Sequence, residues 1–302
     1  MSEKTPLVSV LTLAYNQAPY IRECLDGILM QKTNFAFELL IHDDASTDGT
    51  ADIIREYEAK YPDIIKPIYQ KENQYTRGGK IMERFMYPRA KGKYIALCEG
   101  DDYWTDPLKL QKQVDFMEAN PEYSLCFHAC SIKFEDGITP KKLYSEWEER
   151  DYSCYEILKE WTIPTVSSLF RKEILEKGYY KYITNKNIIY GDNILFSFLA
   201  TYGKVRNIST QEMSVYRRNC GSVINKSINI DKYHKHFNVI RLYVKDEAYK
   251  FLTERYANYI FLKGISKLKQ FNPLFIYFII KAFIIYPKSI LNILKVRYEI
   301  YT

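Results

Sequence analysis

The sequence lacks a hydrophobic run long enough to cross a membrane as an ordinary helix. The apolar stretch near its carboxyl end, residues 274–286, is interrupted by Lys281 and is shorter than the about 20 apolar residues that a spanning helix needs. Residues 1–4 are largely polar and charged, so we expect no secretory signal before the first apolar run. Six cysteines occur without a CxxC pair, which is typical of reduced thiols in a cytoplasmic protein.

Nucleic-acid recognition motifs are also missing, although the formal net charge is +6. Beyond Lys263 the basic residues face almost no acids except Glu299, so the tail is basic, aromatic and amphipathic. Such a segment can lie in the interface of an anionic membrane. The alternative is that the tail packs as a helical hairpin or forms an oligomer contact. We expect no nucleic-acid partner in either case.

Apolar runs of strand length alternate with amphipathic stretches through the first hundred residues. Strands alternating with helices predict a mostly parallel sheet with helices on both faces. In such sheets ligands bind beyond the carboxyl ends of the strands, and Tyr15, Asp44 and Asp102 lie at the carboxyl ends of three of these runs. The expected strands cover residues 7–16, 37–42, 64–70 and 94–98, and the expected helices cover residues 21–29, 51–61, 80–90 and 106–118.

An acidic turn, Glu99-Gly100-Asp101-Asp102, follows the apolar run 94–98. Three carboxylates within four residues repel one another unless a cation neutralises them. The turn therefore indicates a divalent metal, Mn²⁺ or Mg²⁺, that holds a diphosphate and completes its shell with phosphate oxygens and water. The alternative is a solvated acidic turn that only caps the next helix.

Three separated motifs together resemble the bacterial family 2 glycosyltransferases, which have the GT-A nucleotide-sugar fold. They are residues 8–16, residues 43–49 and residues 99–104, followed by Pro107 and the helix that begins near Lys109. The resemblance covers roughly residues 6–220. It implies an α/β GT-A catalytic domain over residues 1–225, with a donor half about 1–105 and an acceptor half about 106–225. Residues 226–302 then form a helical, basic, amphipathic C-terminal region.

The resemblance also implies roles for individual residues on the donor side. Tyr15 and Asp44 would lie against the nucleotide base, where a carboxylate suits an imide N–H. Asp101 would lie near the ribose, and Asp102 would be the metal ligand. Glu99 stands where many relatives have the first aspartate of a DxD motif, so it keeps the charge on a longer arm.

On the acceptor side, a sugar hydroxyl is a poor nucleophile until its proton is removed. Asp192, an isolated acid at the start of an apolar stretch, aligns with the general base of the family. It could instead only cap that helix, because aspartate is a favoured N-cap residue. Arg217 and Arg218, at the end of a strand-like run, could reach the donor diphosphate or be a solvated strand end.

The four histidines fall outside these motifs. His42 and His128 lie in strand-like runs, where a satisfied, partly buried imidazole is expected. His234 and His236 are expected on the surface of a long helix.

These patterns predict a metal-dependent, inverting glycosyltransferase of cell-surface polysaccharide synthesis. The donor would be a UDP-sugar and the acceptor a glycan or lipid-linked glycan, and the enzyme would be cytoplasmic or peripheral on the inner face of the plasma membrane. A sugar-phosphate nucleotidyltransferase is one alternative, but it needs a glycine-rich phosphate loop, which residues 13–17 do not form. A non-catalytic carbohydrate-binding protein is the other, and the intact acids argue against it.

Overall fold

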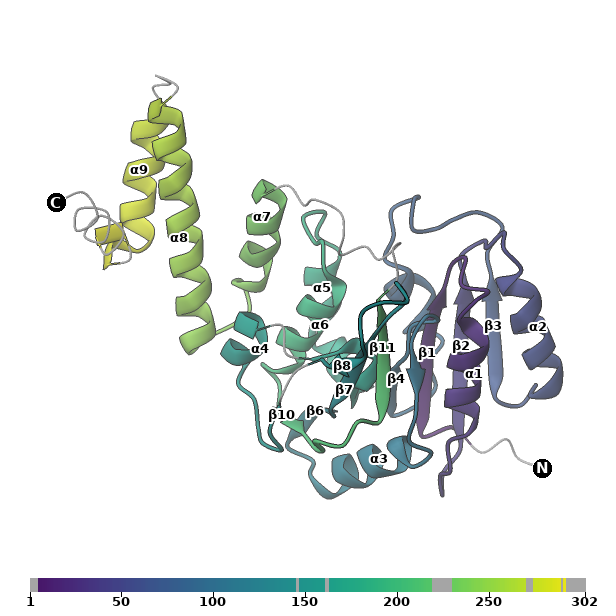
Figure 1. Ribbon diagram of the computed structural model, residues 1–302. Helices are drawn as coiled ribbons and strands as arrows, with labels where there is room; N and C mark the ends of the chain where they lie inside the picture. Colours follow the sequence, from purple (N-terminus) through teal and green to yellow (C-terminus); the bar gives the residue numbers. More distant parts are fainter. Residues whose placement is uncertain are drawn as a thin grey trace.

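A seven-stranded sheet forms the centre of the computed structural model, which describes residues 5–144, 147–160, 163–218, 230–269, 274–288 and 290–291. The strand order is β10-β6-β9-β4-β1-β2-β3 (Figure 1). Strand β1 pairs in parallel with β2 and β4, and β2 pairs in parallel with β3, which confirms the predicted mostly parallel sheet. Strand β9 runs antiparallel to both of its neighbours. The strands are β1 (Val8–Ala14), β2 (Phe37–Asp43), β3 (Ile65–Tyr69), β4 (Tyr94–Leu97), β6 (Tyr123–Phe127), β9 (Leu169–Arg171) and β10 (Lys204–Asn207).

Helices cover both faces of this sheet, as the alternating pattern predicts. Val10 belongs to the hydrophobic cluster that includes α1, whereas its neighbour Leu11 belongs to a second cluster that includes α6. Successive side chains of a strand point to opposite faces, so each face of β1 packs against its own layer. The helices of this part are α1 (Ile21–Leu29), α2 (Thr50–Lys60), α3 (Lys109–Ala119), α4 (Cys154–Glu160), α5 (Tyr179–Ile183) and α6 (Gly191–Leu199), with shorter helical turns at Met82–Met86, Thr165–Ser167 and Lys172–Lys177.

Two expected helices differ from the structure. The helix expected over residues 80–90 is a single π-helical turn, Met82–Met86, and Pro88 follows it, a residue that has no N–H to continue a helix. The helix expected from residue 106 begins at Lys109 instead. Asp106 lies in the turn before it, where its Oδ1 accepts the backbone N–H of Leu108 at 2.8 Å.

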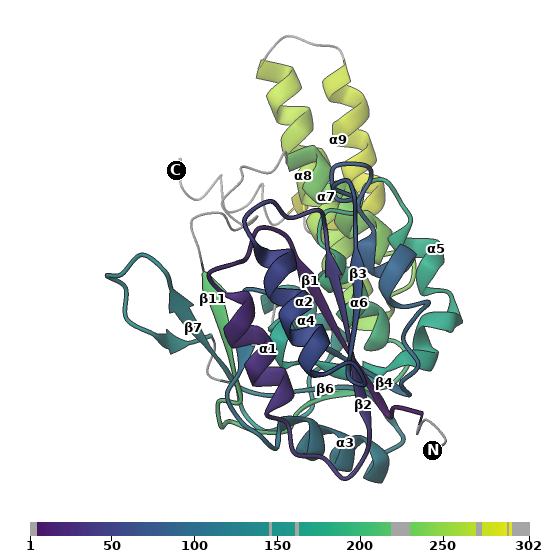
Figure 2. The same cartoon turned by 90° about the vertical axis from the view of Figure 1, so that its right-hand side faces the viewer.

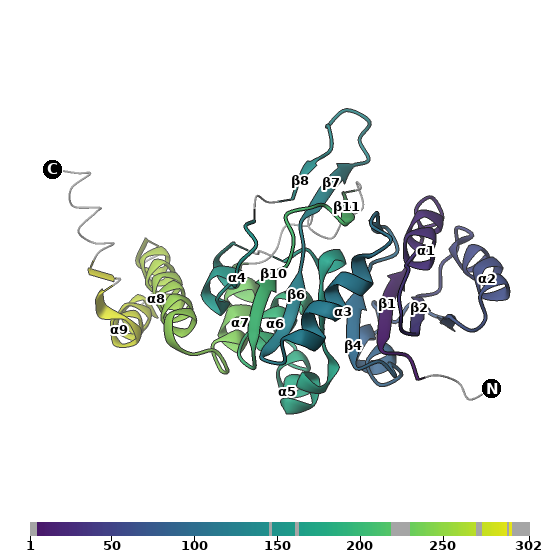
Figure 3. The same cartoon turned by 90° about the horizontal axis from the view of Figure 1, so that it is seen from below.

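A second sheet of four strands lies beside the first, in the order β5-β11-β7-β8. It consists of β5 (Tyr103–Trp104), β7 (Cys130–Phe134), β8 (Lys142–Leu143) and β11 (Ser214–Arg218). The β7–β8 hairpin stands out from the body of the molecule (Figure 3). Because β5 directly follows the acidic turn and pairs antiparallel with β11, this sheet brings residues near 217 to the carboxyl end of β4.

Three helices form the C-terminal part: α7 (Ile230–Ile240), α8 (Asp246–Lys269) and α9 (Leu274–Ile285). The pair α8 and α9 projects from the body as a helical hairpin (Figures 1 and 2). Phe237 and Leu252 belong to the core that α6 shares, whereas Ala257 and Phe261 belong to a separate cluster with α9. Among the described residues, no helix is both long and apolar enough to cross a membrane. The domain boundary expected near residue 225 lies outside the described residues.

Candidate active site

The acidic turn packs directly against the end of β1. A Cβ atom at Gly100 would lie 2.1 Å from Gln17 Oε1 and 3.0 Å from the carbonyl oxygen of Leu13, so a larger residue would push the turn away. Burial, followed by the negative charges of Asp101 and Asp192, raises the pKa of Glu99 to about 8. The structure therefore brings Asp192 close enough to the turn for its charge to act on Glu99, although the two are far apart in sequence.

Asp102 is the most deeply buried acid of this turn, with 1% of its surface exposed. Its Oδ1 accepts the backbone N–H of Arg217 at 2.7 Å, whereas its buried Oδ2 has no hydrogen-bond partner. Burial and the charge of Asp101 raise the pKa of the Asp102 carboxyl well above its usual range. A buried carboxylate oxygen without a partner, beside further acids, fits a hard divalent cation.

A complete metal site is not preformed in the part of the chain that the structure describes. No group of three or more His, Cys, Asp or Glu side chains there is placed to hold a metal ion. The role of Asp102 as the metal ligand stays a prediction. Mg²⁺ in particular is often bound by one or two carboxylates together with substrate phosphates and water.

Arg217 contacts the acidic turn through both its side chain and its backbone. Its guanidinium is buried, donates from Nε to the carbonyl oxygen of Asp101 at 2.6 Å, and pairs with the carboxylates of Glu23 and Glu135. It also lies over the ring of Tyr103, 5.0 Å from the centroid. The donors of Arg217 are thus engaged by protein groups, and a contact of this residue with a donor diphosphate stays a prediction. So does such a contact of Arg218, which is exposed at the end of β11.

Asp192 lies in the first turn of α6 and not at its N-cap. The N-cap residue is Tyr190, and no side chain caps the helix. The Asp192 Oδ1 accepts the N–H of the next residue, Asn193, at 2.8 Å. An acid in the first turn of a helix is favoured by the helix dipole. Its role as the base stays a prediction.

The model of glycosyl transferase family 2 matches residues 9–179. That range includes the acidic turn and the loops after β1 and β2. The chain belongs to glycosyl transferase family 2.

Several curated proteins are similar in sequence to this family 2 chain. An uncharacterized protein of Mycobacterium tuberculosis is 43% identical over 166 residues, which is 55% of this chain and 47% of that protein. The putative teichuronic acid biosynthesis glycosyltransferase TuaG of Bacillus subtilis is 34% identical over 57% of this chain and 65% of its own length. The UDP-Glc:alpha-D-GlcNAc-diphosphoundecaprenol beta-1,3-glucosyltransferase WfaP of Escherichia coli is 28% identical over 76% of this chain and 89% of its own length. The chain spans about half the length of the mycobacterial relative.

Solved structures show the same fold at low sequence identity. S. aureus TarS in complex with UDP-GlcNAc aligns with a TM-score of 0.63 and 18% identity over 84% of this chain and 71% of that one. The mannosyltransferase PcManGT from Pyrobaculum calidifontis, in complex with GDP-Man and Mn²⁺, aligns with a TM-score of 0.51 and 16% identity over 98% and 81% of the two chains. These likenesses confirm the predicted GT-A architecture.

Hydrogen bonds join the loops that follow β1 and β2 in this family 2 chain, at the carboxyl ends of these strands. Asn16 has a φ of 52°, donates its backbone N–H to Ser46 Oγ at 2.9 Å, and accepts the N–H of Thr47 at 2.8 Å. Ala45 also has a positive φ, 63°. Non-glycine residues adopt this left-handed conformation at an energetic cost that the surrounding contacts must offset. Tyr15, the first residue of the loop after β1, is 50% exposed.

Asp44 is buried at the carboxyl end of β2 and accepts hydrogen bonds from the backbone of the segment that follows β3. Its two carboxylate oxygens accept the backbone N–H groups of Gln74 at 2.7 Å and Tyr75 at 3.0 Å. Each carboxylate oxygen has more than one lone pair, so a further donor such as a base N–H can still be accepted. The contact with a nucleotide base stays a prediction.

Sequence reasoning missed two tyrosines that lie close to the acids. Tyr144 and Tyr216 meet edge to face, with ring centroids 5.8 Å apart. Burial, followed by the charge of Asp192, raises the pKa of Tyr144 to about 12, and burial followed by the charge of Asp102 raises the pKa of Tyr216. No motif marks either residue, since they come together only when β7 pairs with β8 and β11.

The expectation for the C-terminal histidines is wrong for His236, which is fully buried. The side chain lies where α7 packs on the residues around the start of α6. His234 is half-buried and stacks on Tyr259, with ring centroids 3.8 Å apart. His42 and His128 are almost completely buried in or beside their strands, deeper than the partial burial we expected.

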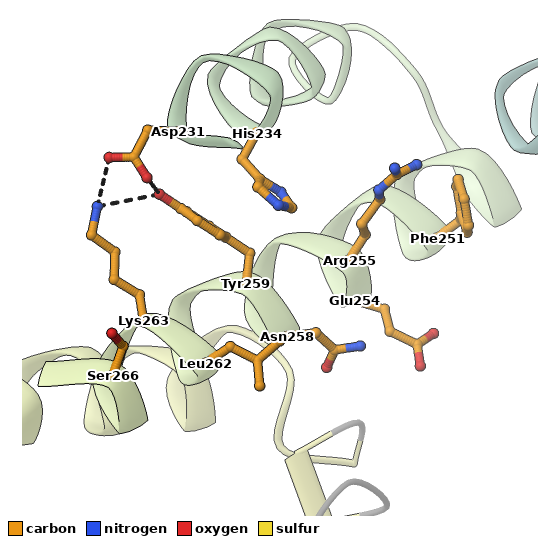
Figure 4. A pocket seen from close by; sticks show the side chains of 10 residues that line it. All are labelled: Asp231, His234, Phe251, Glu254, Arg255, Asn258, Tyr259, Leu262, Lys263 and Ser266. Atoms are coloured by element: carbon orange, nitrogen blue, oxygen red, sulfur yellow. Dashed lines mark hydrogen bonds and ion pairs between the residues drawn. The ribbon is translucent and has the colours of Figure 1, made fainter. Parts of the chain in front are cut away.

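A cavity of about 810 Å³ lies between α7 and α8, apart from the acidic turn (Figure 4). Inside it, Asp231 accepts hydrogen bonds from Tyr259 and Lys263. None of its lining residues belongs to the acidic turn or to the first turn of α6, so we do not assign the donor or the acceptor sugar to it. The lining residues are Asp231, His234, Phe251, Glu254, Arg255, Asn258, Tyr259, Leu262, Lys263 and Ser266.

Proposed function

We propose that the protein transfers a sugar from a nucleoside diphosphate donor, a UDP-sugar, to a hydroxyl group of a glycan. The observation that carries this proposal is the buried Oδ2 of Asp102, which has no hydrogen-bond partner and lies in the acidic turn that follows β4. In this proposal Asp102 acts on the donor side and Asp192 acts on the acceptor side. Family membership and the name of WfaP, which is a UDP-Glc-dependent glucosyltransferase, support the same reaction class.

On the donor side, Tyr15 would stack on the base, Asp44 would accept its N–H, and Asp101 would bind the ribose. Asp102 would hold a Mn²⁺ or Mg²⁺ ion through its unpartnered Oδ2. When bound, such an ion neutralises charge that develops on the leaving diphosphate. Arg217 holds Asp101 and Asp102 in place through its guanidinium and its backbone N–H.

On the acceptor side, Asp192 would accept the proton of the attacking hydroxyl. The hydroxyl oxygen forms a bond to the anomeric carbon, while the bond from that carbon to the diphosphate oxygen breaks and its electron pair leaves with the nucleoside diphosphate. Attack from the face opposite the leaving group inverts the configuration at the anomeric carbon. A well-placed base contributes about 10²- to 10⁴-fold to the rate of such a step.

We propose a lipid-linked glycan at the inner face of the plasma membrane as the acceptor, in cell-surface polysaccharide synthesis. The name of WfaP, which acts on a GlcNAc-diphosphoundecaprenol, supports a lipid-linked acceptor, and the name of TuaG, which refers to teichuronic acid biosynthesis, supports polysaccharide synthesis. Helix α9 contains no acidic residue and exposes apolar side chains at helical spacing, with Lys281 beside them. An apolar face flanked by lysine suits an anionic membrane surface. These exposed side chains are Leu274, Ile276, Tyr277, Ile280 and Ile284.

The variant Asp192→Asn tests the proposed reaction. Asparagine keeps an oxygen that can accept the Asn193 N–H, so the melting temperature should change little, whereas turnover should fall by about 10²- to 10⁴-fold. Transfer from UDP-sugars in the presence of Mn²⁺ is measured together with UDP affinity, which should be unchanged. The matched control is Asp52→Asn, which removes a first-turn aspartate whose side chain is 81% exposed in α2.

Transfer by Asp192→Asn at the parent rate would show that the base lies elsewhere. A parent protein that neither transfers nor hydrolyses any nucleotide sugar with Mn²⁺ would instead favour the non-catalytic carbohydrate-binding alternative. A parent that forms a nucleotide sugar from a sugar phosphate and a nucleoside triphosphate would favour the nucleotidyltransferase.

A further inference from the structure

His236 on α7 contacts the chain on both sides of Asp192. Its Nδ1 lies 3.4 Å from the backbone nitrogen of Ile189, and its Nε2 lies 3.4 Å from Asn193 Oδ1. The ring of Tyr190 meets the imidazole edge to face, with centroids 5.4 Å apart. A side chain from the C-terminal part of the chain thus contacts the segment 189–193 from its first residue to its last.

One protonation state of His236 satisfies both polar contacts. The Ile189 N–H can only donate, so Nδ1 must accept and carry no hydrogen, and Nε2–H can then donate to the amide oxygen of Asn193. This is the neutral imidazole. Burial lowers the pKa of His236 to about 4, so the ring keeps this neutral state at physiological pH.

At the start of α6, local side-chain support comes from Asp192 and not from the N-cap residue. Its N-cap residue is Tyr190, and no side chain caps the first turn, although a capping side chain normally satisfies one of the free N–H groups there. Here the Asp192 carboxylate accepts the N–H of Asn193, and the side chain of Asn193 faces His236. The direction of the Asp192 carboxylate therefore depends on a backbone segment that His236 contacts at both ends.

We propose that His236 is a positioning residue that fixes the segment 189–193 and so aims the Asp192 carboxylate at the acceptor hydroxyl. This inference rests on the proposed function, because it assigns Asp192 the role of base. It also gives α7 a part in the active site. A displacement of a reacting group by about 1 Å can cost up to 10²-fold in rate.

Three substitutions separate the contacts of His236. His236→Asn retains an acceptor near the Nδ1 position, His236→Gln retains a donor near the Nε2 position, and His236→Leu removes both. His236→Leu should lower kcat for transfer by about 10- to 100-fold with unchanged affinity for UDP, and the two amide variants should lose less. The matched control is His234→Gln, two residues away on α7, which faces the cavity of Figure 4 and should leave kcat unchanged.

Amide hydrogen exchange gives a readout that does not depend on catalysis. Exchange at Ile189 and Asn193 should speed up in His236→Leu and stay at the parent rate in His234→Gln. Unchanged exchange at both positions in all His236 variants would overturn the proposal, even if Asp192→Asn is inactive. If His236→Leu does not fold, His236→Asn and His236→Gln decide the question by the same measurement.

A double-mutant cycle tests whether His236 acts through Asp192. In an Asp192→Asn background, His236→Leu should cause little further loss of turnover, because the group that it positions is already gone. A full additive loss in the double variant would refute positioning through Asp192. If Asp192→Asn itself turns over like the parent, the proposed base fails, whereas hydrogen exchange still decides whether His236 holds the segment.

Discussion

The pKa of Glu99, raised to about 8, makes a specific prediction about stability. An ordinary glutamate ionises near pH 4.3 in an unfolded chain, so between that pH and about pH 8 the folded state keeps a proton that the unfolded state has lost. Because the folded state binds more protons in this window, its stability falls as the pH rises through it. The stability is fully present below about pH 4 and is progressively lost toward pH 8.

The size of the effect follows from the shift. Each pKa unit corresponds to about 1.4 kcal/mol, so Glu99 alone removes roughly 3 to 4 kcal/mol of unfolding free energy between pH 5 and pH 8. Glu99→Gln mimics the protonated carboxyl and should escape this loss. At roughly 2 to 4 °C per kcal/mol, the variant should melt about 10 °C above the parent at pH 8 and nearly together with it at pH 5.

Thermal melts of both proteins from pH 5 to pH 8, in a chelator and without nucleotide, measure this difference. Glu148→Gln serves as the control, because the Glu148 side chain is 82% exposed and its replacement should give no gap that grows with pH. A gap between Glu99→Gln and the parent that stays constant from pH 5 to pH 8 would refute the placement of the partly buried Glu99 beside further acids.

Other expected outcomes concern the metal, the base and the membrane. Asp102→Asn should abolish the Mn²⁺-dependent part of UDP affinity in calorimetry, and equal Mn²⁺ enhancement in variant and parent would remove Asp102 from the metal site. Asp44→Ala should weaken uridine binding even without metal; a loss seen only with Mn²⁺ would place Asp44 in the metal shell instead. Ile284→Glu, at a side chain 78% exposed on α9, should reduce sedimentation with anionic liposomes, whereas Ile138→Glu, at a side chain 89% exposed on the β7–β8 hairpin, should not. Equal sedimentation of the two variants would dispose of the α9 membrane surface.

Residues 1–105 show how much of the fold local sequence patterns can predict. The runs that became β1, β2 and β4 are rich in apolar residues and are buried at nearly every position, as strands covered on both faces are. Each is followed by polar residues that the parallel pairing brings to one edge, so Tyr15, Asp44 and Asp102 could be placed together before any coordinates. The same reasoning did not foresee that Asp44 organises residues 74 and 75, because that contact depends on where the chain returns after β3.

The structure of the residues after 105 was harder to predict from the sequence. Strand β9 enters antiparallel between β4 and β6, and three residues leave almost no periodic pattern. Arg217 could be selected as a candidate from the sequence, but its contact with the acidic turn could not be predicted. That contact depends on the pairing of β11 with β5, the strand that follows the turn. His236 was expected on the surface, since the pattern of one helix cannot show that another helix covers it.

The sequence by itself determined the family, the parallel sheet and the acids that follow its strands, because these features depend on local hydrophobic patterns and short motifs. The tertiary structure alone decided that the charge of Asp192 reaches Glu99, that Arg217 supports Asp101 and that α7 packs against the start of α6. These are contacts between segments distant in the chain. They form only when the sheets and helices pack together. Packing brings into contact side chains whose positions no local sequence pattern links.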